Sequence, residues 1–353
     1  MKDQGGPPTT ERRRRLLGIK LRALVSEHLG SPVDVEPVEF GTGAGFVLDG
    51  AAWVIVDGPA GRTLGASLAW AVRNGATSLD VVVDDGGGQV ARRAGGFDFP
   101  VGVWFPEERA LLPIVAETRP EAPSLSADHL ELLPMIEAGG ARPHTERGVV
   151  SGEVRGLEVC RVVDEPTIGN FAELNDVPED LIAARVDASD GIILEVGVGA
   201  NDREAFQLIH GHRPTQEALA DVVSAVTAYR SLDAPQHPLN RMAPERFLRW
   251  QVEEAPALLG LTSLEAIDPP VDRQSMKHPE PCAARGIDES GAAVAVVFSA
   301  GVDLDLIPFV ADVSLGLDDE IERIVVAVPG RDLVPVTADL AALLVRPIEL
   351  VAL

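Results

Sequence analysis

The sequence predicts an α/β protein built from tandem duplicated small α/β sandwich units with mixed sheets. Short apolar runs typical of strands alternate with amphipathic segments typical of helices along the chain. The order of these elements in 12–105 recurs in 244–353. Two neighbouring strands can pair in parallel only if a crossover connection, usually a helix, joins them. Strands that alternate with helices therefore indicate sheets with parallel pairs.

The first copy opens with a helix over 12–30, in which Leu16, Ile19 and Leu24 share one face and Gly30 ends the helix. The other elements follow in chain order: strands at 33–40, 45–48 and 53–56, a helix over 64–72, a strand at 79–83, a helix around 89–94 and a strand at 101–105.

The last copy repeats this order. It begins with the helical segment PERFLRWQVEEAPALLGL, and DGAAWVIVD aligns with SGAAVAVVF, SLDVVVDD with ERIVVAVPG and FPVGVWF with RPIELVAL. Its expected elements are strands at 264–267, 283–286 and 293–298, a helix over 304–315, a strand at 324–328, a helix over 337–344 and a strand at 348–352. The edges of small open sheets could be covered by edge-to-edge pairing of the copies or by dimerisation, and we expect the two terminal copies to pack against each other within the chain.

The middle region, 124–235, has a different order of elements. It contains a hairpin of strands 149–154 and 157–163, the apolar strand IILEVGVG and two helical segments. The sequence leaves open whether this is a worn third copy. The predicted domains are therefore 1–112, 124–235 and 244–353.

Charge and cysteine usage restrict the function classes. The formal net charge is −25, and residues 1–30 carry 7 basic and 3 acidic side chains, whereas 106–243 carry 11 basic and 24 acidic ones. This acidity disfavours a broad nucleic-acid interface without excluding one, and it favours a protein partner or a second copy. The chain has no apolar run that would span a bilayer or serve as a secretory leader, so we expect a cytoplasmic protein without membrane contact. Cys160 and Cys282 are isolated, which indicates buried free thiols.

The sequence resembles two known groups of proteins, one in several sequence stretches and the other in the order of its elements. Stretches such as LGASLAWAVRNGATSLDVVVDD, LEVGVGANDREAFQLIHG and HPLNRMAPERFLRW resemble a family of uncharacterised actinobacterial proteins, which implies no activity. The order helix, three strands, helix, strand resembles the restriction-endonuclease-like core. That resemblance implies an Asp on one strand and a D/E-x-K motif on the next, which together hold Mg²⁺ and position water. Every copy departs from it, since Gly58 and Pro59 or Gly197 stand where the lysine belongs, and AVVFSAG has no acid.

Two functions from different classes remain open. The first is a non-catalytic interaction or scaffold protein built from duplicated degenerate α/β units, with no cofactor. The alternative is a divergent metal-dependent phosphodiesterase or nuclease that acts through the middle region with Mg²⁺ or Mn²⁺. Whether the protein is an enzyme stays open. The alternative assigns catalysis to Glu195, Asp202 and His210, and metal binding to Asp164, Asp190 and Glu195.

A second candidate site lies in the proline-bounded segment APQHPLNR. His237, Asn240 and Arg241 there could recognise a carboxylate or phosphate of a ligand or partner. A rigid linker whose polar groups satisfy the loop backbone is the other interpretation.

Overall fold

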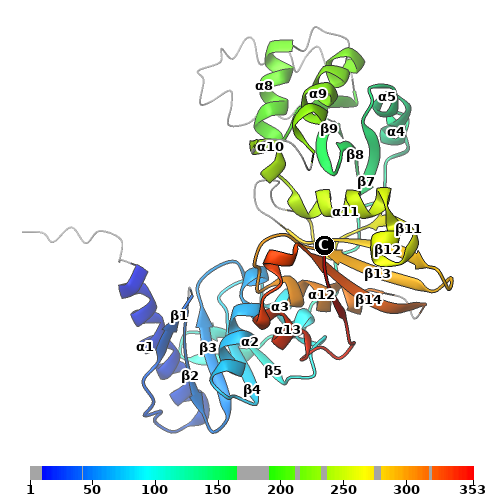
Figure 1. The fold of residues 1–353 in the computed structure, drawn as a ribbon. Helices are drawn as coiled ribbons and strands as arrows, with labels where there is room; N and C mark the ends of the chain where they lie inside the picture. The colour runs from blue at the N-terminus through cyan, green and yellow to red at the C-terminus, as the bar shows by residue number, and fades with distance from the viewer. Residues whose placement is uncertain are drawn as a thin grey trace, which may run out of the picture. The chain divides into compact units, whose positions relative to one another are not determined.

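The structure is a computed structural model that describes residues 10–41, 43–164, 191–210, 215–231, 237–273, 280–317 and 320–353. The chain is a mixed α/β protein that folds into two compact units (Figure 1). Unit 1 comprises Met1–Pro120 and Gly301–Leu353, and unit 2 comprises Glu121–Ala300.

The large sheet of unit 1 follows chain order, β1-β2-β3-β4-β5-β6. It is antiparallel from β1 to β3 and from β5 to β6, and parallel from β3 to β5, where helices make the crossovers. The strands are β1 (Val38–Phe40), β2 (Gly43–Leu48), β3 (Ala51–Val56), β4 (Ser78–Val82), β5 (Val101–Glu107) and β6 (Ala110–Pro113). The helices are α1 (Thr10–Leu29), η1 (Ala60–Arg62), α2 (Leu64–Arg73) and α3 (Gly87–Ala94).

Helices α1 and α2 cover opposite faces of this sheet. Phe46 pairs with Trp53 across β2 and β3, and both pack in one apolar cluster with Leu21 of α1. Gly45 is next to Phe46 and therefore faces the other side. A Cβ at Gly45 would lie 3.1 Å from the ring of Trp70 on α2, so glycine allows this close packing.

The C-terminal segment of unit 1 packs on the helices of the first segment. It contains α12 (Leu306–Leu315), β14 (Ile321–Val328), η3 (Gly330–Asp332), α13 (Pro335–Ala341) and β15 (Glu349–Ala352), and β14 pairs parallel with β15. Helix α12 contacts α2 and α3, and α13 contacts α2. A Cβ on Gly96 would lie 2.8 Å from that of Ala311, so glycine permits the approach. The expectation that the chain's first and last regions pack together is confirmed for these helices.

An ion-pair cluster is buried between these helices. Asp312 on α12 accepts hydrogen bonds from Arg92 Nε at 2.9 Å and Arg93 Nε at 3.1 Å. Gly65 N donates to Asp305 Oδ1 at 2.9 Å, just before α12 begins.

Unit 2 contains an antiparallel sheet in the order β10-β9-β8-β7. Its strands are β7 (Arg142–Glu146), β8 (Val149–Val154), β9 (Leu157–Val163) and β10 (Ile193–Val196). The helices around it are α4 (Ala127–Leu130), α5 (Leu133–Ala138), α8 (Ala200–His210), α9 (Thr215–Tyr229) and α10 (Pro238–Arg241). Ile136 of α5 and Leu219 of α9 join the apolar core of one sheet face.

The remaining elements of unit 2 are α11 (Pro244–Glu254), η2 (Pro256–Leu259), β11 (Leu261–Ile267), β12 (Cys282–Asp288) and β13 (Ala293–Phe298). The three strands form an antiparallel ladder, and α11 packs on it. All six residues of β13 are buried, as its continuous apolar sequence indicates. The free thiols of Cys160 and Cys282 are buried, as predicted.

The predicted α/β class is confirmed, and so is the hairpin of β8 and β9. Five elements were not predicted from the sequence: β6, α4, α5, β7 and the short helix α10. A restriction-endonuclease-like topology, the duplication and the three-domain division stay predictions. Within the described ranges, no helix combines the length and apolarity that crossing a bilayer requires.

Candidate functional site

One face of the β7–β10 sheet carries polar side chains, and the strand register aligns four of them. His144 on β7 pairs with Ser151 on β8, Ser151 pairs with Arg161 on β9, and Arg161 pairs with Glu195 on β10. Directly opposed residues project to the same side of a sheet. The four side chains therefore form a row across it, and the opposite face carries the apolar core.

A β-bulge in β9 adds another charge to this face. Ser151 and Glu153 are two residues apart on β8, but their partners Arg161 and Glu158 are three residues apart on β9. The extra residue lets Glu158 and Arg161 project to the same side, where strict alternation would separate them. Arg161 Nε and Nη2 donate to the two carboxylate oxygens of Glu158 at 3.0 and 2.9 Å, a forked pair.

Helix α8 brings a buried arginine to the same carboxylate. Arg203 Nη1 donates to Glu158 Oε1 at 2.7 Å, and its Nε lies 3.5 Å from Glu195 Oε2. Glu195 is 1% exposed, and Arg203 provides the countercharge that a buried carboxylate requires.

The chain turns sharply from β10 into α8. Gly197 and Gly199 have φ values of 141° and 82°, in the region that favours glycine. A Cβ on Gly197 would lie 2.8 Å from the backbone nitrogen of Arg203, so the residue also permits a close approach. Asp202 Oδ2 accepts the N–H of Val198 at 2.7 Å and stabilises the turn.

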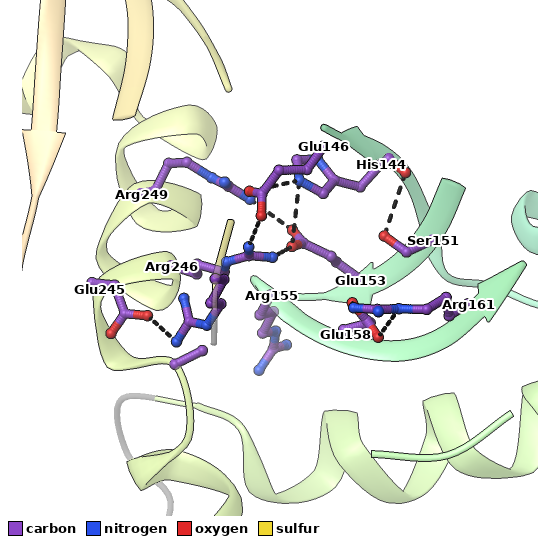
Figure 2. Close-up of polar contacts among 12 residues, drawn as sticks. His144, Glu146, Ser151, Glu153, Arg155, Glu158, Arg161, Glu245, Arg246 and Arg249 are labelled. Carbon is purple, nitrogen blue, oxygen red and sulfur yellow. Dashed lines mark hydrogen bonds and ion pairs between the residues drawn. The ribbon is translucent and has the colours of Figure 1, made fainter. Parts of the chain in front are cut away.

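Helix α11 covers the β7–β8 end of the polar face with two buried arginines (Figure 2). Arg246 and Arg249 are three residues apart and so lie on one side of the helix. Arg246 Nη1 and Arg249 Nη2 donate to the two oxygens of Glu153 at 2.8 and 2.7 Å. Arg246 Nη2 also donates to Glu146, and Arg249 Nε lies 3.1 Å from Glu253 Oε1.

These contacts keep Glu146, Glu153 and Arg246 charged at neutral pH. Burial alone would raise the pKa of Glu146, but His144 and Arg246 outweigh it and hold that pKa at about 2. The pKa of Glu153 is also lowered, because Arg249, His144 and Arg246 together outweigh burial. Desolvation opposes the charge of Arg246, yet Glu146 and Glu153 raise its pKa.

The turn between β7 and β8 places a further arginine beside this face. Arg147 and Gly148 have φ values of 46° and 78°, as a two-residue type I′ hairpin turn requires. The Arg147 backbone N–H donates to Asp268 Oδ1 at 2.7 Å, and its Nε donates to the carboxylate of Asp272. The side chain of Arg147 is 7% exposed.

A cavity of about 560 Å³ lies over this polar face. Its lining contains five arginines and three carboxylates: Arg147, Arg161, Arg203, Arg246, Arg273, Glu146, Glu158 and Asp272. Each guanidinium offers five N–H donors and no acceptor, whereas an ionised carboxylate offers about four acceptor positions. Among the lining side chains, donors and positive charge therefore exceed the carboxylates, and Glu153, Glu195 and Glu245 outside the lining pair with Arg246, Arg203 and Arg273. Such a wall favours a ligand with anionic oxygens.

Two nitrogen atoms of lining residues strengthen this interpretation. Arg246 Nε and His144 Nε2 are buried and make no hydrogen bond to any residue that the structure describes. His144 Nε2 lies 3.6 Å from Glu146 Oε2 and 3.8 Å from Glu153 Oε1, beyond hydrogen-bond distance. Arg246 Nε is always a donor, and leaving it unsatisfied costs about 1–3 kcal/mol, which an acceptor on a bound ligand would recover.

The residues predicted to be catalytic have different environments. Glu195 lies in the polar row beside Arg203, and Asp202 is exposed at the start of α8. His210 is the last residue of α8, and its side chain lies outside what the structure describes. Their joint action stays a prediction.

The predicted metal ligands are also not seen together. Asp164 is 80% exposed and lies 2.9 Å from His129 Nε2, whereas Asp190 lies outside the described residues. In the parts of the chain that the structure describes, no three His, Cys, Asp or Glu side chains are grouped so that they could hold a metal ion. The metal-dependent alternative stays a prediction.

The predicted ligand residues 237–241 lie at α10, outside the lining of the cavity. His237 Nδ1 accepts the N–H of Leu239 at 3.3 Å and caps this short helix, and its ring stacks on Tyr229 with centroids 4.1 Å apart. Asn240 Oδ1 is buried without a hydrogen bond to the described residues, and Arg241 is exposed. Their role in recognition stays a prediction.

Most of the cavity's charged residues are not among the predicted site residues. One signal was present: Glu153, Glu158 and Arg161 interrupt the apolar strands VVSGEV and LEVCRVV. Charges inside an otherwise buried strand pair indicate a polar face that another element covers.

We compared the chain with protein-family models, with curated proteins and with solved structures, and none of them matches it.

Proposed function

We propose that the protein is a non-catalytic binding protein whose unit 2 takes up a small anionic molecule in the arginine-lined cavity. The observation that carries the proposal is the lining itself, in which five arginines face the cavity with three carboxylates. Charge-assisted hydrogen bonds from arginine to a carboxylate or phosphoryl group are among the strongest polar contacts available to such a site.

Neither the hydroxyl of Ser151 nor the thiol of Cys160 is activated as a nucleophile, which supports binding over catalysis. Ser151 Oγ donates to the main-chain oxygen of His144 at 3.4 Å. The thiol of Cys160 has its pKa raised to about 12 by burial, so it carries almost no thiolate at neutral pH.

We also propose that the chain contains a duplicated α/β unit. In chain order, α1, β1–β3, α2, β4, α3 and β5 are matched by α11, β11–β13, α12, β14, α13 and β15. The first three strands of each set pair antiparallel, and the last two pair parallel. The middle region, which supplies most of the cavity lining, is then inserted between the two copies, and the second copy adds Arg246 of α11 and Asp272 and Arg273 after β11.

Isothermal titration of inorganic phosphate, sulfate and acetate into the full chain tests the binding function. The test variant is Arg161→Met, because Arg161 is 37% exposed and Glu158 keeps Arg203 as a partner. Arg323→Met is a matched control. Arg323 also lies on a strand, is 38% exposed and makes a forked pair at 3.0 and 2.7 Å with Glu349, but it lies in unit 1.

We expect saturable binding of at least one anion to the wild type and to Arg323→Met. Loss of a charge-assisted hydrogen bond, worth about 1.5–3 kcal/mol, should weaken binding to Arg161→Met about tenfold or more. Absence of saturable binding of all three anions at millimolar concentrations would overturn the proposal, as would equal binding by all three proteins.

A further inference from the structure

The arginines of the cavity reach it from two sides of the same polar face, one at β9 and α8 and the other at the β7–β8 turn and α11. We propose that its ligand is a small molecule with two separate anionic groups, phosphoryl or carboxylate, one bound at each side. This inference rests on the proposed anion-binding function and specifies the ligand class for the same cavity.

The first subsite lies at β9 and α8. Arg161 and Arg203 both reach the carboxylate of Glu158, and all three line the cavity. The lining continues through the first residues of α8 to Asn201, so the positive end of an 11-residue helix dipole lies at this side. Glu158 and Glu195 use part of the donors of these two guanidinium groups, and the N–H groups that remain can bind an anionic group of a ligand.

The second subsite lies at the β7–β8 turn and α11. Arg147 comes from the turn, Arg246 from α11, and Arg273 from the segment after β11. Arg246 is 5% exposed, and its Nε has no hydrogen-bond partner within the described ranges. A buried guanidinium nitrogen without an acceptor indicates a position for a ligand oxygen.

Strand β8 separates the two subsites. Neighbouring strands lie about 4.8 Å apart, so Glu146 on β7, which binds Arg246, and Arg161 on β9 are anchored about 10 Å apart. Ser151 of β8 lies in the lining between them and offers a hydroxyl group to the middle of a ligand. A single small anion would reach one subsite, whereas a molecule with an anionic group at each end would reach both.

Titration of α,ω-alkanediol bisphosphates of increasing chain length into the full protein tests this geometry. The alkyl monophosphates of equal length and the α,ω-dicarboxylates form the comparison series. Linking two binding groups makes the second contact intramolecular, so affinity should pass through a maximum where the linker matches the span. At that length we expect the bisphosphate to bind at least about tenfold more tightly than the monophosphate, and the dicarboxylates show which anion the subsites prefer.

Two variants assign the ends. Arg161→Met and Arg147→Met should each reduce the affinity for the best bisphosphate to the monophosphate level, while the control Arg323→Met binds like the wild type. Arg147→Lys serves if Arg147→Met does not fold. It retains the charge but loses the forked donors, so we expect a smaller loss.

The outcomes separate the two proposals. Bis-anions that bind no more tightly than mono-anions at every length, with binding still dependent on Arg161, would overturn the two-subsite inference and leave anion binding intact. No binding of any probe would overturn both.

Discussion

Asp312→Ala tests how much the buried ion pairs contribute to the stability of unit 1. The fully shielded carboxylate accepts hydrogen bonds from Arg92 Nε at 2.9 Å, Arg92 Nη2 at 3.2 Å and Arg93 Nε at 3.1 Å. Removing one partner of a buried pair costs about 3–5 kcal/mol, because the other charges stay desolvated. Arg92 keeps Glu117 at 2.9 Å, and Arg93 keeps the Gly61 carbonyl at 2.7 Å. We therefore expect a loss near the lower limit, about 3 kcal/mol.

Urea unfolding followed by tryptophan fluorescence measures this loss. Trp53, Trp70 and Trp104 lie in unit 1, and Trp250 lies in unit 2, so the signal reports mainly on unit 1. Far-UV circular dichroism follows both units and shows whether they unfold in one step or two. A loss of free energy below about 1 kcal/mol, the range of a surface ion pair, would refute the reasoning.

A triple variant controls for the change of volume. Asp312→Leu with Arg92→Met and Arg93→Met replaces the ion cluster by apolar side chains of similar size. Such replacements are often neutral, so we expect the triple variant to be more stable than Asp312→Ala. The opposite order would show that the pairs themselves, and not the unpaired charges, determine the effect.

Three more perturbations have defined outcomes. Burial raises the pKa of Asp305 to about 6, so its stabilising contribution is present at acidic pH and is lost as pH rises through about 6. The melting temperature of Asp305→Asn relative to that of the wild type should therefore increase as the pH rises from 4 to 7. A difference in melting temperature that stays constant over this range would contradict it. Arg230→Met should lower stability by about 3 kcal/mol or more, because the buried guanidinium donates to four main-chain oxygens between 2.8 and 3.0 Å; an unchanged unfolding midpoint would be inconsistent with that role. Cys160 and Cys282, each with a pKa raised to about 12 chiefly by burial, should react with a thiol reagent only after denaturation, and rapid labelling of the native chain would show that the thiols are accessible.

Local pattern predicted much of the fold because most elements have apolar periodicity. The predicted strands 149–154 and 293–298 are β8 and β13. Strand β7, with the sequence RPHTE, has no alternation of apolar residues, so propensity could not reveal it. Its place depends on pairing with β8, which is a tertiary effect.

The candidate site was less accessible to sequence reasoning. Arg246 and Glu153 are 93 positions apart, and their pairing depends on where α11 packs. In a linear sequence, Glu and Arg usually indicate solvent-exposed positions, since buried charges are rare without partners. Asp202 and His210 were predicted because a carboxylate near a histidine in sequence suggests acid–base or metal chemistry. The charged groups that lie together in the structure are instead arginines and glutamates.

The extra residue in β9 has a consequence for recognising this site in other proteins. Because of this residue, the strand has the pattern Glu-x-x-Arg over 158–161. A spacing of three places two residues on one face of a helix, so a pattern search would assign the segment to a helix. Deleting Val159 would restore alternation and turn either Glu158 or Arg161 into the apolar core below α9. Proteins that share this cavity should therefore retain the three-residue spacing even where the lengths of the neighbouring strands and loops differ.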